Sequence, residues 1–212
     1  FIKLIDEIES HLLVEKFGYE ILSLVKDTYT INKTIEQATL EFVNKLFADY
    51  GLLVFLPDNA AFKKELIPVL SKELHEQFSN KQVTETIAEF PEDYKVQVAG
   101  RQINLFYLKD DIRERIELKD NGYSVVNTSL FFTKEEMNHE LMNHPERFSP
   151  NVILRPVYQE IILPNIAFIG GGGELAYWLE LKKVFSAVNV PFPVLLLRNS
   201  FMVIPSGVSN RM

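Results

Sequence analysis

The chain has 212 residues, 47% of them apolar and 12% aromatic, which is enough to bury a sizeable core in one large domain or in one domain with an appendage. Its formal net charge of −7 argues against a broad nucleic-acid surface. The absence of cysteine excludes disulfides and thiolate metal ligands and fits a cytoplasmic location, and no apolar run approaches the length of a membrane span.

The first quarter of the chain predicts helices followed by a buried strand. Apolar residues at helical spacing predict a helix over residues 2–16, whereas residues 19–29 are ambiguous. Asn32 is the predicted cap of the next helix, which Gly51 ends. The continuous apolar run Leu52–Leu56 predicts a strand that is buried on both faces.

Two further helices are predicted before the sequence changes character. Asp58 is the predicted cap of a helix that Pro68 bends or interrupts, and Val83–Glu89 predicts another short helix. The chain opens on Phe1, in a segment that already resembles the middle of a helix. We therefore expect an internal piece of a longer protein.

The middle of the chain predicts a small antiparallel sheet. Apolar and charged residues alternate over Ile112–Leu118, and Asn121-Gly122 predicts a type I′ turn into a second strand, Tyr123–Val126. Ile103–Lys109 is a candidate for a third strand.

The last third predicts two helices and then a strand–loop–helix–strand unit. A capping box opens a helix over residues 133–143, and Asn151–Leu163 predicts a buried helix. Ile166–Ile169 and Pro193–Leu197 are predicted strands on either side of the helix Glu174–Val188. About thirty residues is the size of a right-handed βαβ crossover, so we expect two parallel strands here.

Four consecutive glycines join the first of these strands to the helix: Gly170, Gly171, Gly172 and Gly173. The dinucleotide fingerprint fails because Leu175 stands at its third glycine position. The phosphate loop of the NTPases also fails, because Glu174 follows the last glycine where a lysine is needed.

The glycine loop nevertheless has the physical features of an anion site. Backbone N–H groups can turn toward a ligand there, and a helix start is electropositive. Arg198, Asn199 and Ser200 follow the second strand and should lie at the same sheet edge as the glycine loop. The equally weighted alternative is that the glycines only permit close packing and that Glu174 complements the helix dipole.

Polar side chains also occur in the predicted buried helix. Arg155 and Gln159 lie one turn apart and could reach into one pocket. The favoured alternative is an internal Arg–Glu pair that locks the helix in place. The spacing of the four histidines predicts no metal site.

A long stretch of the sequence resembles a known family. The segment RFSPNVILRPVYQEIILPNIAFIGGGGELAYWLELKKVF, followed by VPFPVLLLRNSFMVI, closely resembles the BshC family, the cysteine ligases of bacillithiol biosynthesis. The likeness is strong over Arg147–Ile204 and weaker over Gly51–Leu70. The His-x-Gly-His motif of nucleotidyltransferase type, which the resemblance leads us to expect, does not occur.

The resemblance implies a fold, a reaction and partners. The fold is a Rossmann-like, nucleotidyltransferase-type core with helical connections, followed by a coiled coil through which the full-length protein forms a homodimer. The reaction joins cysteine to glucosaminyl-malate to give bacillithiol, with ATP or ADP as an associated nucleotide. The coiled coil should begin near or after Arg211, so that most of it is missing here.

We therefore predict an α/β protein with a partial Rossmann-like parallel sheet, flanking helices and a small antiparallel β-hairpin insertion. The predicted segments are a helical part with one core strand (1–90), the antiparallel insertion (91–132), helices with the βαβ unit (133–204) and a tail (205–212).

The predicted function is that of an enzyme fragment, inactive alone, which adds cysteine to glucosaminyl-malate. The residues predicted to bind substrate or nucleotide are Gly170, Gly171, Gly172, Gly173, Glu174, Tyr177, Arg198, Asn199, Arg155 and Gln159. No catalytic residue is identified. The alternative is a non-catalytic ligand-binding or assembly module, because no acid–base pair or nucleophile is visible. A dinucleotide-dependent oxidoreductase is a weaker third hypothesis.

Overall fold

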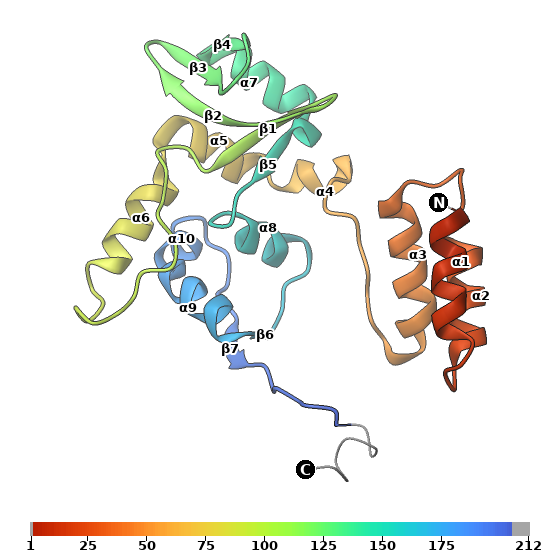
Figure 1. Cartoon of the computed structure of the whole chain (residues 1–212). Helices are drawn as coiled ribbons and strands as arrows, with labels where there is room; N and C mark the ends of the chain where they lie inside the picture. The colour runs from red at the N-terminus through yellow and green to blue at the C-terminus, as the bar shows by residue number, and fades with distance from the viewer. Residues whose placement is uncertain (1, 205–212) are drawn as a thin grey trace. The chain divides into compact units, whose positions relative to one another are not determined.

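The computed structural model describes residues 2–204 and divides the chain into two compact units, Phe1–Pro57 and Asp58–Met212. The first unit consists of the helices α1 (Ile2–Leu12), α2 (Gly18–Thr28) and α3 (Ile35–Phe47) and the 3₁₀ turn η1 (Ala48–Tyr50) (Figure 1). The helix expected over residues 2–16 is confirmed, and the ambiguous residues 19–29 are helical. The core of this unit is small and contains Ile5, Leu22 and Ala38.

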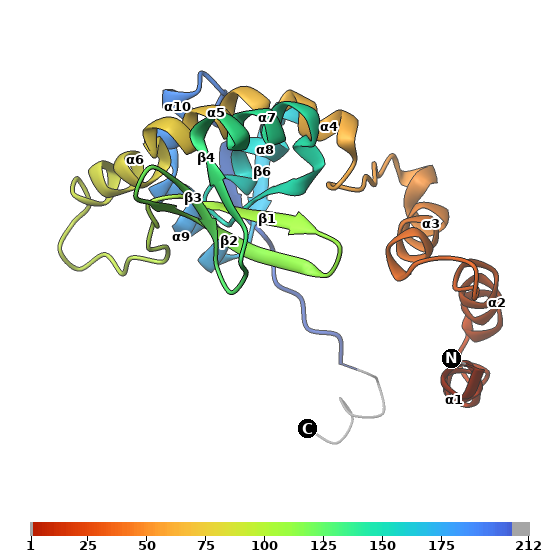
Figure 2. The same ribbon diagram turned by 90° about the horizontal axis from the view of Figure 1, so that it is seen from above.

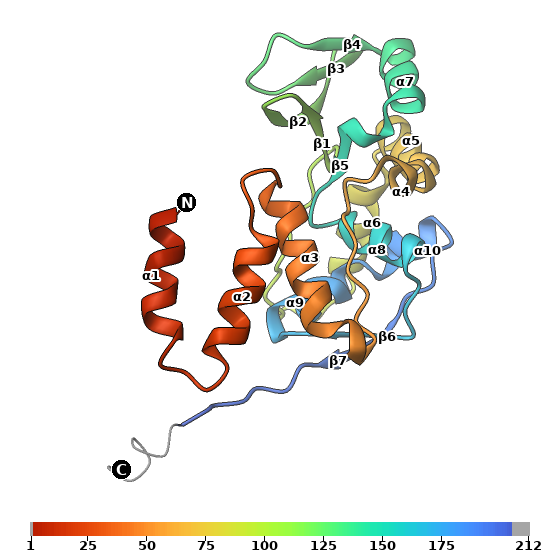
Figure 3. The same cartoon turned by 90° about the vertical axis from the view of Figure 1, so that its right-hand side faces the viewer.

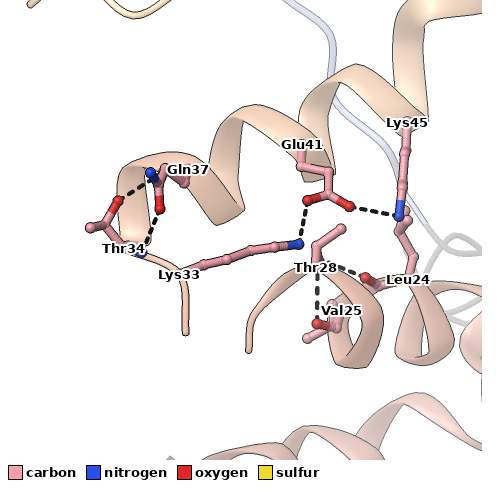
Figure 4. A network of polar contacts seen from close by, with 8 residues as sticks. All are labelled: Leu24, Val25, Thr28, Lys33, Thr34, Gln37, Glu41 and Lys45. Carbon is pink, nitrogen blue, oxygen red and sulfur yellow. Dashed lines mark hydrogen bonds and ion pairs between the residues drawn. The ribbon is translucent and has the colours of Figure 1, made fainter. Parts of the chain in front are cut away.

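The start of α3 differs from the prediction. Its cap is Thr34, not Asn32: the Thr34 hydroxyl accepts from the Gln37 amide at 3.2 Å, and the Gln37 side chain accepts from the Thr34 amide at 3.1 Å (Figure 4). A box of this kind satisfies two helix amides at once, which Asn32 cannot do. Farther along α3, Glu41 pairs with Lys33 and, at 2.9 Å, with Lys45 (Figure 4).

The strand predicted at Leu52–Leu56 is wrong. These residues are irregular, and Leu52 and Leu53 are 45% and 77% exposed. A strand needs a neighbouring strand for its backbone hydrogen bonds, and neither of the sheets described within residues 2–204 includes this run. The stop signal before it is confirmed, because Gly51 closes η1 with φ of 78°.

The second unit begins with three short helices: α4 (Ala60–Glu65), α5 (Ile67–Glu76) and α6 (Phe78–Ile87). The predicted interruption at Pro68 is confirmed, since this proline lies in the first turn of α5, just after the break from α4. The predicted cap is one residue off. Asn59, not Asp58, caps α4 by accepting from the Ala61 amide at 2.8 Å.

The main sheet of this unit is antiparallel. Its strands are β1 (Leu105–Lys109), β2 (Ile112–Lys119), β3 (Gly122–Val125), β4 (Phe131–Thr133) and β5 (Phe148–Pro150), in the order β4-β3-β2-β1-β5 (Figure 1). The predicted fold class, a parallel Rossmann-like sheet with only a small antiparallel insertion, is therefore wrong. The strand β5 comes from a segment expected in the parallel core, yet it pairs antiparallel with β1 and extends the hairpins to five strands.

The turn between β2 and β3 lies one residue earlier than predicted. Lys119 pairs with Gly122, so Asp120 and Asn121 form the turn, and Asp120 takes the positive φ of 50°. The predicted type I′ turn at Asn121-Gly122 is therefore wrong, although both flanking strands are confirmed.

The two faces of this sheet differ in chemistry. One face packs against α5 and α7 (Lys134–Asn143), which lie on the same side of the sheet (Figure 2). It carries the buried side chains Leu105, Tyr107, Ile116, Tyr123, Val125 and Phe148. The capping box that opens α7 is confirmed, with Thr133 and Glu136 bonded reciprocally. The opposite face carries Phe106 and Arg115, which stand directly across from each other on β1 and β2.

The βαβ unit follows the helix α8 (Arg155–Ile162) and contains β6 (Ala167–Gly170), α9 (Gly172–Glu180), α10 (Lys182–Ala187) and β7 (Val194–Leu197) (Figure 3). The parallel pairing of β6 with β7 is confirmed. The predicted continuous helix is instead two helices that meet at Leu181. Trp178 of α9 stacks on Phe168 of β6, with ring centroids 4.0 Å apart, and this contact holds the helix on the strand pair.

Candidate anion-binding site at the glycine turn

The glycine turn and Arg198 lie at one edge of the β6–β7 pair. Gly170 pairs with Leu197, and the amide of the next residue, Arg198, donates to the Gly170 carbonyl at 2.8 Å. The carboxyl ends of two parallel strands meet there, as the sequence predicts.

The Arg198 guanidinium reaches back over the turn. A methyl group added to Gly171 would lie 3.2 Å from Arg198 Nη2 and 3.4 Å from Glu174 Oε2. Glycine at this position therefore leaves the space in which a guanidinium and a carboxylate approach the backbone. Arg198 is exposed and takes part in no ion pair within residues 2–204, so its charge is available to an anion.

Glu174 already occupies part of the helix start. Its Oε2 accepts from the Gly171 amide at 2.8 Å and caps α9. This contact supports the structural role of Glu174 at the helix dipole. An anion at this site would depend on Arg198 and on the amides of Gly172 and Gly173 in the first turn of α9.

The remaining predicted residues fall into two groups. Asn199 is exposed directly after Arg198, and Tyr177 is half-buried on α9. Arg155 is exposed at the start of α8, and the Gln159 amide donates to Glu160 Oε1 at 3.2 Å. No hydrogen bond or ion pair described between residues 2 and 204 links Arg155 or Gln159 to the turn.

The internal Arg–Glu pair expected in α8 is not formed among the described residues. Glu160 is 3% exposed and accepts instead from the backbone amide and the side chain of Asn165, at 2.8 and 2.9 Å. The buried carboxylate therefore fixes the loop after α8 and leaves Arg155 at the surface.

A cavity of about 520 Å³ lies beside the first turns of α9. Gly173 and Tyr177 line it, together with four polar residues that sequence reasoning missed: Gln97, Arg101, Arg115 and Asn151. The only signal in the sequence concerns Arg115, because the alternation in β2 places this residue on the face away from the core. Nothing local in the sequence shows that α9 approaches this face.

The described residues offer neither a metal site nor a membrane span. Between residues 2 and 204, no group of three or more His, Asp or Glu side chains could hold a metal ion. None of the helices described there has the length and apolar character needed to cross a membrane.

Comparison with known proteins identifies relatives. Residues 1–199 match the family model described as "Bacillithiol biosynthesis BshC, N-terminal Rossmann-like domain". The chain is 52% identical to a protein of Flavobacterium johnsoniae, over 85% of this chain and 34% of that protein. It is 49% identical to a protein of Christiangramia forsetii, over 94% of this chain and 38% of that protein. Both carry the name "Putative cysteine ligase BshC", and the chain spans about a third of their length.

Proposed function

Because the chain belongs to the BshC family, whose N-terminal domain it matches over residues 1–199, we propose that it forms part of a cysteine ligase of bacillithiol biosynthesis. The observation that supports this proposal most strongly is the identity of about half of all aligned residues with relatives that bear the ligase name. The activity belongs to the complete protein, of which these residues are one part.

The proposed reaction joins cysteine to glucosaminyl-malate through an amide bond. The amine of glucosaminyl-malate attacks the carboxyl carbon of cysteine, a C–N bond forms, and one carboxyl oxygen leaves as water. If ATP first phosphorylates the carboxylate, that oxygen leaves with phosphate instead. Negative charge develops on the remaining carboxyl oxygen as the amine attacks, and positioned N–H donors stabilise such a charge.

The glycine turn is the part of the described residues that suits an anion best. We assign to Arg198, with the amides of Gly172 and Gly173, the binding of an anionic group of glucosaminyl-malate or of a nucleotide phosphate. Glu174 lies near the guanidinium, Asn199 directly follows Arg198 in the chain, and both would orient amine or hydroxyl groups. Arg155 and Gln159 are left out of this site, because no described contact ties them to it.

The test is product formation by the complete protein. Cysteine and glucosaminyl-malate are incubated with and without ATP, and the condensed thiol is quantified by mass spectrometry. Arg198→Ala should raise the KM for glucosaminyl-malate about tenfold or more, because a hydrogen bond to a charged group is lost. Arg198→Lys should recover part of the loss, since it restores the charge without the planar fork.

Lys182→Ala serves as the matched control, because it removes an exposed positive charge from α10. Unchanged kinetics of Arg198→Ala would remove Arg198 from the site. Ligand binding without any product, under every condition, would favour the non-catalytic module over the ligase.

A further inference from the structure

The cavity beside α9 carries positive charge that the proposed reaction does not use. Arg101 and Arg115 both line this cavity of about 520 Å³, and both also line an adjoining one of about 340 Å³. The two arginines therefore stand together between two hollows. They come from different elements, since Arg115 lies on β2 and Arg101 precedes β1.

The segment that carries Arg101 is irregular, yet its first half is firmly anchored. The Tyr94 hydroxyl donates to the Ala176 carbonyl of α9 at 2.7 Å. The Glu180 carboxylate accepts from the amides of Gln97 and Val98, at 2.7 and 3.0 Å. Glu180 is fully buried. One wall of the cavity is thus held to α9 through backbone hydrogen bonds to a buried charge.

The second half of the segment is anchored by another buried carboxylate. Glu73 of α5 accepts from the Asn104 amide at 2.9 Å. Asn104 in turn holds the backbone of Arg101 from both sides, with its Oδ1 3.1 Å from the Arg101 amide and its Nδ2 2.8 Å from the Arg101 carbonyl. Asn151, which lines the cavity, donates to the same Asn104 oxygen at 2.8 Å.

Burying the carboxyl groups that anchor this segment costs free energy, and packing alone does not explain why they are buried. A carboxylate without solvent is unfavourable unless hydrogen bonds compensate it, and burial raises the pKa of Glu73 despite the bonds from Ser79 and Asn104. Two buried glutamates, Glu73 and Glu180, fix one irregular segment. Residues that bind ligands commonly lie on loops held by a rigid scaffold, because preorganisation lowers the cost of binding.

The guanidinium groups of Arg101 and Arg115 remain available to bind an anion. Arg101 takes part in no ion pair within residues 2–204, and the ion pair of Arg115 with Glu117 is long, at 3.6 Å. A guanidinium presents a planar fork that matches carboxylate and phosphate oxygens. Apolar residues, among them Val98 and Val152, form another part of the lining. The volume lies within the range of small-molecule sites.

We propose that the cavity between Arg101, Arg115 and the first turns of α9 binds a small organic anion, whose carboxylate or phosphate group lies between the two guanidinium groups. The apolar part of the ligand packs against Val98 and Val152, and Asn151 and Tyr177 orient its polar groups. This site shares Gly173 with the glycine turn, but its guanidinium groups are those of Arg101 and Arg115 instead of Arg198, and it does not depend on the ligase reaction.

Calorimetric titration of the complete protein tests the proposal with two probes. L-Malate represents carboxylates, and inorganic pyrophosphate represents phosphates, so the better probe identifies the source of the anionic group. Arg101→Ala and Arg115→Ala should each weaken binding of that probe about tenfold or more. Arg113→Ala is the matched control, because Arg113 projects from the same face of β2 and stacks on Phe106 but does not line the cavity.

A second measurement needs no variant. Phenylglyoxal modifies accessible guanidinium groups, and peptide mass spectrometry locates each modified arginine. The bound probe should protect Arg101 and Arg115 and leave Arg113 reactive. Protection of Arg198 alone would place the anion at the glycine turn, which supports the proposed ligase site and overturns this one.

Three other results would also overturn the proposal. The first is that neither probe binds at millimolar concentration. The second is that Arg101→Ala and Arg115→Ala bind the probe as the unaltered protein does. The third is an equal loss in Arg113→Ala, which would show diffuse attraction by the sheet face and no defined site. Loss of ligase activity with intact probe binding would count against the proposed function only.

Discussion

Alanine substitutions along the glycine turn should have opposite effects on stability at neighbouring positions. Gly172 and Gly173 begin α9, neither has a positive φ, and a methyl group added to either would meet nothing within 4 Å. Alanine fits such positions without strain and restricts the unfolded chain. Gly170 differs, because its methyl group would lie 2.6 Å from Phe168 Cε1 and 3.1 Å from Leu175 Cδ2.

The expected magnitudes follow from this geometry. Gly172→Ala and Gly173→Ala should each raise the free energy of unfolding by about 0.4–1 kcal/mol, which corresponds to a Tm about 1–4 °C higher. Gly170→Ala should lower it by about 1–3 kcal/mol, the usual cost of overpacking. Phe168 cannot move aside freely, because it is stacked on the buried Trp178.

Tryptophan fluorescence provides the assay. Trp178 is the only tryptophan of the chain and lies in α9, so its emission during thermal unfolding reports on this unit. Destabilisation by Gly172→Ala or Gly173→Ala would refute the reasoning, because it would mean that something occupies the space beside the helix start.

Binding of the anion probes, L-malate and pyrophosphate, distinguishes the two variants. Gly173 lines the Arg101–Arg115 cavity and Gly172 does not, so only Gly173→Ala should weaken binding.

Two further predictions concern pH. Lys63 is 1% exposed, and burial lowers its pKa from the ordinary value of 10.5. The native state therefore releases this proton more readily than the unfolded chain does. As a result, the free energy of unfolding rises as the pH rises toward 10.5. Lys63→Met should remove this rise, as measured by urea unfolding at neutral pH and at about pH 10. Burial alone would raise the pKa of Glu140, but hydrogen bonds from Tyr107 and Arg147 outweigh burial and lower the pKa. The stability that these hydrogen bonds contribute is therefore lost as the pH falls through the pKa of Glu140 in the folded state. Tyr107→Phe should therefore cost about 1–2 kcal/mol at neutral pH and less in acid, and an equal cost at both pH values in urea unfolding would contradict this assignment.

Local signals in the sequence predicted the elements that depend on local chemistry. The alternation in Ile112–Leu118, the capping box at Thr133 and the break at Pro68 each act within a few residues, and all three are present. The run Leu52–Leu56 looks equally strand-like, but a strand also needs a partner, and the sequence contains no local signal for one. The same limit applies to β5, whose antiparallel pairing with β1 contradicts the parallel sheet implied by the resemblance.

The candidate sites show the same division between local and long-range information. The glycine turn and Arg198 could be placed together because the ends of two parallel strands must meet. The cavity could not be predicted, because its irregular wall is anchored by residues far away in sequence. Glu73 lies 31 positions from Asn104, and Glu180 lies 82 positions from Val98. In a sequence, these two glutamates look like ordinary solvated charges.

The helix α9 explains why residues predicted for one site belong to two. Positions separated by four and then three residues share a face of a helix. Gly173, Tyr177 and Glu180 form one such stripe: the first two line the cavity and the third holds the loop at Gln97. The next stripe begins with Glu174, which caps the turn, and continues with Trp178, which packs on β6. One helix therefore presents its Tyr177 face to the cavity and its Glu174 face to the glycine turn. A variant such as Tyr177→Phe should affect probe binding without disturbing the cap that Glu174 forms on the Gly171 amide.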